Sequence, residues 1–425
     1  MRGRRLGEMM YVLQPILSHM IKFGSLKVVN ADGKIYRFNG ESSELAPSEV
    51  CVRFHDKQYA RWLALSPSMA LGKGYMEGRV SVENGTIYDF IQLLALNVEQ
   101  DDYHWLHRLF DQIDALRKRF QQFNPARKSR HNVAHHYDLS GELYELFLDR
   151  DRQYSCAYFE QPENDLDTAQ TDKKNHIAAK LLLQGDHRVL DIGSGWGGMG
   201  LYIARHFGAK VDGITLSEEQ LKESNQLAKS ENLDNKAKFY LRDYRNLEDT
   251  YDRIVSVGMF EHVGVNHFKT YFSKIHDCLA QDGVALLHTI GRIGHPTVTD
   301  PWIRKYIFPG GYIPSLSEIM PAIENTGMVV TDVEFLGLHY AETLKHWQQG
   351  FQANRDKVNE IYDETFCRMW EYYLACSEVS FRHLDSTVLQ IQMVKDRRVV
   401  PMTRDYMAKN ESAIREAIAN DNRAA

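Results

Sequence analysis

The stretch that most constrains this chain is VLDIGSGWGG, residues 189–198, in which an apolar run leads into an acid and a cluster of glycines. Val189 to Ile192 is short and largely apolar, as in a buried parallel strand, while Gly193, Gly195 and Gly197 permit a turn that a Cβ would obstruct. The pattern predicts a strand, a tight turn and a helix, with the turn cradling a nucleoside ligand. Dinucleotide-binding proteins carry a similar G-x-G-x-x-G pattern and such turns also occur without a ligand, so both alternatives stay open here.

The length of 425 residues predicts two domains, because it exceeds what one hydrophobic core usually supports. Hydrophobic residues make up 43% of the chain and charged residues 25%, as in soluble globular proteins. The net charge of -6 argues against a general polyanion binder, so we expect no nucleic-acid partner. The absence of a C-x-x-C pair predicts a reducing, cytoplasmic compartment and no structural metal. The cysteines are Cys51, Cys156, Cys278, Cys367 and Cys376.

Residues 6–21 carry apolar side chains at helical spacing behind a basic start, without the core of a signal peptide. This helix either packs on its own domain or lies on a membrane surface. We favour packing, because an apolar stripe is usually core and Pro15 would disturb a longer surface helix. The stripe consists of Leu6, Met9, Met10, Leu13, Ile16, Leu17, Met20 and Ile21.

Short strand patterns and glycines over residues 25–95 predict a small α+β domain that extends over residues 1–120. The strand segments include SLKVVN, KIYRFNG and RVSVENGTIYDF. We expect the main domain over residues 135–402. A C-terminal helix with a disordered tail, beginning at Asn420, is expected over residues 403–425.

A basic linker is expected between the two domains, over residues 121–134, after a helix at 101–120. No acid occurs between Ala115 and Tyr137. The cations in this region either face solvent or meet an anionic membrane surface, and the sequence does not separate the two. They are Arg117, Lys118, Arg119, Arg127, Lys128 and Arg130.

Helix and strand patterns alternate from Lys173 onward, which predicts a doubly wound, mostly parallel sheet. The expected strands are 187–192, 209–214, 236–241, 251–257 and 284–290, and the expected helices are 173–183, 197–207 and 217–230. Ligands bind at the carboxyl ends of the strands in such sheets, so residues at those ends should converge on one crevice. These residues are Gly193, Thr215, Asp243, Gly258 and His288.

A series of motifs spans roughly residues 130–395: HHYDLSGELYELFL, YSCAYF, LDIGSGWGG, GITLSEEQ, SVGMFEHVG, LLHTIG, IFPGGYIPS, HYAETL and YLACSEVSFR. In order and spacing, this series resembles that of cyclopropane fatty acid synthases. The resemblance implies a Rossmann-like class I methyltransferase domain behind an N-terminal domain similar to that of phospholipid-acting bacterial members. The short segment from Gly291 to Phe308 favours that branch, because mycolic acid cyclopropane synthases carry a longer insertion there.

The resemblance implies S-adenosylmethionine as the cofactor. The local chemistry agrees, because Thr215-Leu216-Ser217 stands where the nicotinamide fingerprint has a ribose-binding acid. By resemblance, Gln220 recognises the ribose, and Asp243 and Tyr244 lie near the adenine. The implied cofactor-binding residues are Tyr154, Ser155, Asp191, Gly193, Ser194, Gly195, Trp196, Gly197, Thr215, Leu216, Ser217, Gln220, Asp243, Tyr244 and Gly258.

The chemistry of ring formation calls for a proton acceptor. An alkene is a poor nucleophile that has to be held against the methyl donor in a dry pocket, and ring closure removes a proton from the added methyl group. The resemblance implies that a bound bicarbonate accepts this proton. The side chains of Glu261, His288 and Tyr340 and largely the backbone of Cys156 and Ile290 are implied to hold it. Glu261 and His288 follow neighbouring strands, so they can face one crevice.

Cys376 in YLACSEVSFR matches a cysteine that is sometimes treated as the active-site residue of the family. Direct displacement at a sulfonium methyl group needs no covalent enzyme intermediate, and a cysteine on an apolar helix is usually a small core residue. Cys376 therefore stays among the candidate catalytic residues, but we expect it to have no nucleophilic role.

The function implied is methylene transfer to a cis double bond in an acyl chain of a membrane phospholipid. The enzyme would be cytoplasmic, peripheral to the inner membrane surface and, by analogy, a homodimer. Two alternatives stay open: methyl- or methylene-branching of the same alkene, which differs only in the fate of the proton, and a non-catalytic lipid-binding protein. The intact motifs count against the second alternative.

Overall fold

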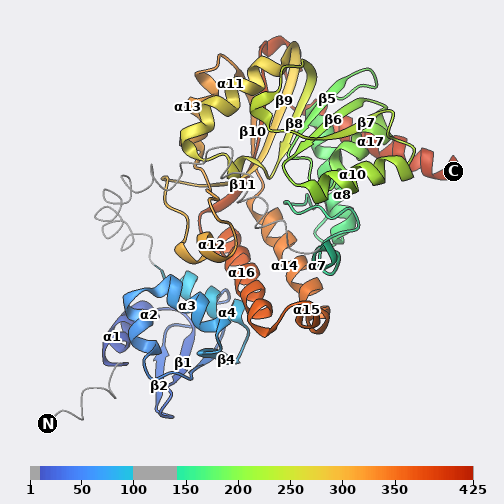
Figure 1. Cartoon of the computed structure of the whole chain (residues 1–425). Coiled ribbons are helices and arrows are strands. Elements are labelled where there is room, and N and C mark those ends of the chain that lie inside the picture. Colours follow the sequence, from blue (N-terminus) through green and yellow to red (C-terminus); the bar gives the residue numbers. More distant parts are fainter. Residues whose placement is uncertain (1–9, 99–140, 425) are drawn as a thin grey trace. The chain divides into compact units, whose positions relative to one another are not determined.

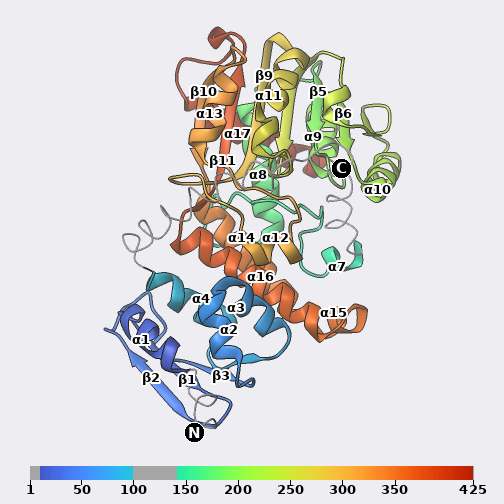
Figure 2. The same cartoon turned by 60° about the vertical axis from the view of Figure 1, so that its left-hand side comes forward.

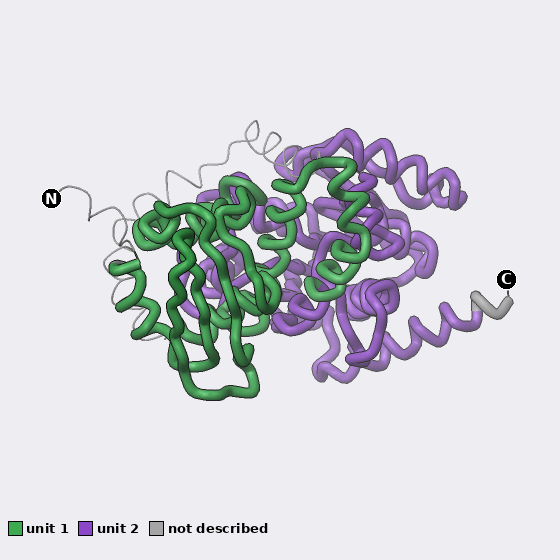
Figure 3. The backbone as a smooth tube through the Cα atoms, turned by 90° about the horizontal axis from the view of Figure 1, so that it is seen from below, with its two compact units in different colours: residues 1–117, 298–308, 344–385 green, residues 118–297, 309–343, 386–425 purple. Residues whose placement is uncertain are grey.

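The computed structural model describes residues 10–98 and 141–424, and the chain divides into two compact units, coloured green and purple in Figure 3. Unit 1 comprises residues 1–117, 298–308 and 344–385, and unit 2 comprises the rest. The predicted basic linker and the helix predicted at 101–120 lie outside the described residues. Among the described helices, none combines the length and the apolar character that crossing a membrane requires.

Unit 1 is built on a four-stranded sheet of order β2-β1-β3-β4, in which β1 is antiparallel to β2 and parallel to β3. Helices accompany these strands in the chain, so the predicted small α+β domain is confirmed. Its elements are α1 (Met10–Met20), β1 (Ser25–Val29), β2 (Ile35–Asn39), β3 (Val50–Phe54), α2 (Tyr59–Leu65), α3 (Pro67–Met76), β4 (Val80–Asn84), α4 (Ile87–Leu96), α12 (Pro301–Tyr306), α15 (Arg355–Ile361), α16 (Glu364–His383) and the later part of α14 (Gly337–Ala353).

Two of the three predicted strand segments of unit 1 form strands, while the third changes to a helix halfway. The prediction for RVSVENGTIYDF is wrong beyond Asn84, because α4 begins at Ile87. A capping box starts this helix: the Asp89 N–H donates to Thr86 Oγ1 at 3.1 Å, and the Thr86 N–H donates back to Asp89 at 2.7 Å. Two reciprocal hydrogen bonds thus start a helix directly after β4, where the sequence pattern predicted a continuing strand.

From Met10 onward the N-terminal stripe packs within unit 1, as the favoured alternative predicted, while Leu6 and Met9 lie outside the described residues. Helix α1 contacts α2 and β2, and Met10, Leu13 and Leu17 are buried. Ile16 departs from the predicted stripe, because 49% of its surface is exposed.

Unit 2 contains a seven-stranded sheet of order β10-β11-β9-β8-β5-β6-β7, whose strands run side by side in Figure 1 and Figure 2. The five strands from β9 to β7 are parallel, and β11 is antiparallel to both of its neighbours. Its elements are α7 (Gly141–Glu145), α8 (Leu166–Lys180), β5 (Arg188–Ile192), α9 (Gly198–Phe207), β6 (Lys210–Thr215), α10 (Glu218–Ser230), β7 (Ala237–Leu241), η1 (Tyr244–Asn246), β8 (Tyr251–Val257), η2 (Phe260–His262), η3 (Val265–His267), α11 (Phe268–Cys278), β9 (Leu279–Arg292), α13 (Leu316–Glu324), β10 (Val329–Phe335), the start of α14, β11 (Ser386–Val394), η4 (Arg397–Val399) and α17 (Asp405–Ala424).

Apolar cores cover both faces of the large sheet. Leu190 and Ile192 of β5 join one core with residues of α11 and α13, while Val189 joins a second core with residues of α8 and α9. Successive side chains of a strand point to opposite faces, so a strand buried on both sides reads as a continuous apolar run. This arrangement confirms the doubly wound, mostly parallel sheet.

The domain boundaries differ from the continuous domain predicted over residues 135–402. Residues 344–385 cluster with unit 1 because α16 packs against α3 and α4. Residues 298–308 join the same unit, and Trp302 lies so close to Gly72 that a Cβ there would stand 2.6 Å from the indole ring. The C-terminal helix continues to Ala424, so the disordered tail predicted from Asn420 is wrong over these residues.

Candidate functional site

The glycine turn between β5 and α9 adopts the left-handed backbone that its sequence predicts. Gly193, Gly195 and Gly197 have φ values of 85°, 53° and 90°. A Cβ on Gly193 would stand 2.7 Å from Met259, and one on Gly197 would stand 2.9 Å from Phe239, so these two glycines permit close packing. A Cβ on Gly195 would meet no described heavy atom within 4 Å, and this glycine faces open space.

A cavity containing about 1190 Å³ of empty space, part of it open to solvent, lies at this turn. Residues that follow β5, β6, β7 and β8 all contribute to its wall, as the rule for strand ends predicts. All of the implied cofactor residues except Gly197 and Ser217 line it. Ser217 instead caps α10, since its hydroxyl accepts the N–H of Gln220 at 3.3 Å.

Polar side chains of the cavity wall hold one another in place. Thr215 Oγ1 donates to Gln220 Oε1 at 2.9 Å. The Asp243 carboxylate caps η1 by accepting the Arg245 N–H at 3.0 Å, and it also accepts from the Arg245 guanidinium at 2.6 and 2.8 Å. Asp243 therefore both caps a helix and lines the cavity, so the two interpretations of this residue are compatible.

Several cavity residues were not predicted from the sequence. The Arg152 guanidinium lies 4.5 Å from the centre of the Trp196 ring and pairs with Glu223. His262 lines the cavity beside Glu261, and burial lowers the pKa of its imidazole to about 4, so the ring is neutral. The other residues that were missed are Gln153, Ile192, Met199, Ile214, Arg242, Arg245, Val257, Met259 and Val263.

A buried lysine supports the cavity from behind. Lys173 of α8 is 1% exposed, and its ammonium donates to Gln153 Oε1 at 2.9 Å and to Ser155 Oγ at 2.8 Å. Burial lowers the pKa of Lys173 to about 7 and raises the pKa of Asp191 to about 7, although the lysine charge partly opposes the second shift. A buried lysine on a polar helix gives no local sequence signal, because a solvent-facing lysine has the same pattern.

Glu261 and His288 lie next to this cavity and are both buried. Glu261, in η2, accepts the N–H of Ile290 at 2.6 Å through Oε1, while Oε2 has no hydrogen-bond partner among the described residues. Burial raises the pKa of Glu261 to about 7. Met259 precedes η2, His262 is its last residue, and both line the cavity, so Glu261 lies between two residues of the cavity wall in the chain.

His288, on β9, has the same pattern of one engaged and one unengaged atom. The Gln390 amide donates to Nδ1 at 3.1 Å, and Nε2 has no partner in the part of the chain that the structure describes. Burial lowers the pKa of His288 well below its usual value, so the ring is neutral and carries its proton on Nε2. The His288 carbonyl accepts the N–H of Gly258, which lines the cavity, at 2.9 Å.

The remaining residues implied for the proton acceptor come together through the start of α14. Cys156 Sγ lies 3.8 Å from the Leu336 carbonyl, which also accepts the Tyr340 N–H at 3.3 Å. The Leu336 N–H donates to Val388 at 2.8 Å, and Val388 stands opposite Ile290 in the sheet. Four separate chain segments thus meet around the end of β9.

Cys376 lies in α16 of unit 1, whereas the cavity and the acid and imidazole behind it are formed by unit 2. Burial raises the pKa of its thiol to about 12. A nucleophilic cysteine needs the thiolate form, so this environment opposes such a role.

The resemblance implies methyl transfer, and replacing Cys376 by Ser is expected to leave most of that activity, because the half-buried thiol has a raised pKa and stays neutral. The rate of methyl incorporation, measured beside the thermal unfolding temperature, checks this. Near-total inactivation with an unchanged unfolding temperature would show that the thiol is needed.

The arrangement combines a nucleoside-sized cavity with a buried acid and a neutral imidazole, each with one polar atom available. Such a pair can hold a small anion and move a proton out of contact with water. No cluster of three or more His, Cys, Asp or Glu side chains that could hold a metal ion occurs among the described residues.

Comparison with known proteins gives consistent matches. Residues 124–391 match the family model described as mycolic acid cyclopropane synthetase. A probable fatty acid methyltransferase of Pseudomonas putida is 35% identical over 87% of this chain and 94% of its own length. The cyclopropane-fatty-acyl-phospholipid synthase of Escherichia coli K12 is 37% identical over 81% of this chain and 87% of its own. A crystal structure of a mycolic acid cyclopropane synthase complexed with SAH and CTAB, 35% identical, covers 64% of this chain and 99% of its own with a TM-score of 0.60.

Proposed function

The chain belongs to the mycolic acid cyclopropane synthetase family, and on that premise we propose that it converts a cis double bond of a phospholipid acyl chain into a cyclopropane ring. It is an S-adenosylmethionine-dependent methyltransferase. The ring, the phospholipid and the use of bicarbonate are the parts that we propose.

The observation that carries the proposal is the buried pair Glu261 and His288. Each has one polar atom held by a neighbour and one atom without a partner among the described residues. Buried polar atoms are rarely left unpaired, so an unpaired acceptor and an unpaired donor fit a small ligand that can both give and take a hydrogen bond. Bicarbonate has that character, and bound there it would supply the base for proton removal.

The cavity in turn fits S-adenosylmethionine, which supplies an electrophilic methyl group when bound. Gly195 leaves open space where a side chain would stand, and Gln220 and Asp243 offer polar groups for a nucleoside. Tyr154, Ser155 and Gly258 line the cavity, and the N–H of Gly258 donates to the His288 carbonyl. These residues would hold the cofactor and keep water from the reacting carbon.

Glu261 and His288 have complementary parts in the proposed proton removal. His288 offers an N–H from a neutral ring, so it can orient an anion by a hydrogen bond without placing a positive charge beside it. Glu261, with its pKa raised to about 7, can exchange a proton near neutral pH. The proton lost from the added methyl group would leave the acyl chain through this pair. The electron pair of the broken C–H bond would form the C–C bond that closes the ring.

Membrane phospholipid is the proposed substrate because the similarity to the phospholipid-acting synthase of E. coli covers 81% of this chain. The similarity to a mycolic acid cyclopropane synthase of known structure covers 64% of this chain. We infer that unit 1 contributes to meeting the lipid, at the cytoplasmic face of the inner membrane and in a homodimer. The basic segment that we expect at an anionic membrane surface lies outside the described residues.

Branching of the same alkene without ring closure is the second candidate, since the P. putida relative is called a probable fatty acid methyltransferase. It requires the same cofactor cavity but not a base directed at the added methyl group. The buried acid and imidazole favour ring closure. A non-catalytic lipid-binding role is not proposed, because the chain is a methyltransferase.

The test is to incubate the purified protein with vesicles of unsaturated phospholipid and methyl-labelled S-adenosylmethionine, and to identify the acyl products by mass spectrometry. We expect each product to gain one CH2 and to resist ozone, which cleaves a double bond but not the ring. Vesicles of saturated phospholipid should give no labelled acyl chain. Labelled products that ozone still cleaves would identify the branching reaction instead.

A further inference from the structure

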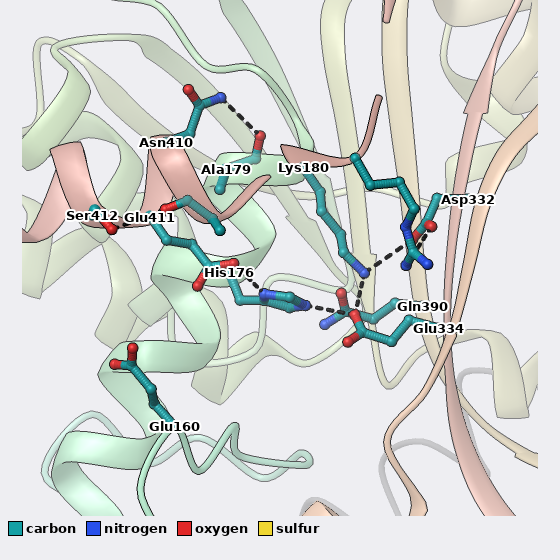
Figure 4. A network of polar contacts seen from close by, with 12 residues as sticks. Glu160, His176, Ala179, Lys180, Asp332, Glu334, Gln390, Asn410, Glu411 and Ser412 are labelled. Carbon is teal, nitrogen blue, oxygen red and sulfur yellow. Dashed lines mark hydrogen bonds and ion pairs between the residues drawn. The ribbon is translucent and has the colours of Figure 1, made fainter. Parts of the chain in front are cut away.

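Helix α17 lies beyond the residues that match the family model, yet it contributes buried side chains to unit 2. It packs against α8, and Asn410 donates to the Ala179 carbonyl of that helix at 3.4 Å. Glu411, one residue later, is only 8% exposed and lies beside His176 of α8 (Figure 4). A helix that merely covered the surface would not bury a carboxylate.

His176 is held between two carboxylates from different elements. Its Nδ1 lies 2.6 Å from Glu411 on α17, and its Nε2 lies 2.6 Å from Glu334 on β10 (Figure 4). Both ring nitrogens therefore donate, which requires the charged imidazolium. Burial opposes this charge, but the hydrogen bonds to Glu334 and Glu411 outweigh it and raise the pKa of His176.

Further ion pairs fix the two carboxylates. Lys180, fully buried on α8, pairs with Glu334 and lies 3.3 Å from Asp332. Arg415 of α17 pairs with Glu411 at 3.1 Å. Loss of one member of a buried ion pair leaves the charge of the other buried without a partner, which is strongly destabilising. Such a network is therefore stable in few arrangements of its side chains. The ring of His176 is consequently held in one place.

A stack of aromatic rings extends from His176 toward the reaction site. The His176 and Tyr158 rings are 4.2 Å apart and nearly parallel, at 10°, and the Tyr158 and His339 rings are 4.8 Å apart at 13°. A cation over the face of a tyrosine ring is an attractive arrangement. Tyr158 lies two residues after Cys156, and His339 directly precedes Tyr340.

Hydrogen bonds join the two chain segments at the far end of this stack. The Phe159 N–H donates to His339 Nδ1 at 3.0 Å. Thr343 Oγ1 accepts the Ala157 N–H at 3.0 Å and donates to the His339 carbonyl at 2.7 Å. The backbone around Cys156 and the first turns of α14, which carry Tyr340, are thus tied together beside the stacked rings.

We propose that Glu411 and His176 are positioning residues for methyl transfer, acting through the stacked rings of Tyr158 and His339. Helix α17 would set the position of the Cys156 backbone and Tyr340, which the proposed function assigns to the proton acceptor, and the inference rests on that function. The described residues that line the cofactor cavity do not include Glu411, His176, Tyr158 or His339, so we expect the network to affect the chemical step rather than cofactor binding.

The test compares Glu411→Gln and Tyr158→Leu with the control Ser412→Ala in the full chain. Glu411→Gln removes a charge of the network, and Tyr158→Leu breaks the stack and leaves the charges in place. Ser412 is exposed, and its hydroxyl donates to the Ala408 carbonyl of its own helix. With unsaturated phospholipid vesicles, we expect both variants to lower kcat about 10-fold, since small displacements near a reacting centre are costly. The fraction of ozone-sensitive product should rise in both, while the Kd of S-adenosylmethionine changes less than about twofold.

Each outcome of this test has one meaning. Folded Tyr158→Leu protein with wild-type kcat and product ratio would overturn the proposal, even if Glu411→Gln failed to fold. Parallel losses of cofactor binding and kcat would also overturn it, because they indicate a purely structural role. If wild-type protein forms only branched products, the proposed function fails instead, and kcat for methyl transfer still tests the positioning.

Discussion

Replacing Glu261 by Gln is expected to lower kcat by about 10²- to 10⁴-fold, the range that positioned acid–base groups supply. Glutamine retains the oxygen that accepts the Ile290 N–H at 2.6 Å, but its amide cannot accept a proton at the position of Oε2. Glu261 does not line the cofactor cavity, so the Kd of S-adenosylmethionine should stay within about twofold of wild type. Methyl incorporation into phospholipid vesicles gives kcat, and calorimetry gives the Kd.

Carbonate-free buffer provides the matched control for this variant. Wild-type kcat should fall in such buffer and recover when bicarbonate is added back. Glu261→Gln should lose little more, because two changes that remove the same step are not additive. Fully additive losses, or a loss of cofactor affinity in the variant, would contradict the assignment of Glu261 to proton removal.

The same substitution is expected to stabilise the protein in alkaline buffer. Burial raises the pKa of Glu261 from its ordinary 4.5 to about 7. The native state therefore holds this proton more tightly than the unfolded chain does, and stability is lost as pH rises from 4.5 to 7. At pH 8 the charged carboxylate costs up to about 3 kcal/mol, which shrinks to about 1 kcal/mol at pH 5.

Calorimetric unfolding at two pH values checks whether the substitution raises or lowers stability. The Glu261→Gln protein should unfold at a higher temperature than wild type at pH 8, with a smaller difference at pH 5. A variant that is less stable than wild type at pH 8 would mean that the carboxylate has a favourable partner. Gain of stability with loss of kcat is typical of a residue kept for chemistry.

The parts of the fold that were predicted are those that local pattern determines. Strands β5 to β8 were predicted within one residue at each end, because short apolar runs between turn signals leave little choice. Strand β11 was missed, because Gln390 and Gln392 interrupt its apolar run. Their amide NH2 groups donate to His288 and to the Lys180 carbonyl, which are distant in sequence, so only the tertiary structure makes a buried strand of this segment.

In the site, too, the features that were predicted are those with a local sequence pattern. The glycine turn was predicted because positive φ values leave a sequence trace in Gly193 and Gly195. Arg152 was not, although it too has a positive φ of 50°, because an arginine signals neither a turn nor a cavity wall. The resemblance pointed to Glu261 and His288, but their burial and their unpartnered atoms emerged only when the strand ends were brought together.

Replacing Gly195 by Leu is expected to weaken binding of S-adenosylmethionine by about 100-fold or more, equal to about 2.7 kcal/mol. The side chain would start from a Cβ that meets no described atom within 4 Å and would project into the space that the cavity provides. Isothermal titration with S-adenosylmethionine measures the change directly, and kcat at saturating cofactor should fall less than affinity does.

Gly327→Leu is the matched control, because it separates occupation of the cavity from backbone strain. Gly327 also has a positive φ, 82°, and open space at its Cβ, but it lies in the turn between α13 and β10 and not at the cavity. Both leucines pay the left-handed backbone cost of about 1–2 kcal/mol, so the two variants should lose similar stability. Cofactor affinity should fall only in Gly195→Leu. Equal affinities in the two variants would mean that the space beside Gly195 is not where the cofactor lies.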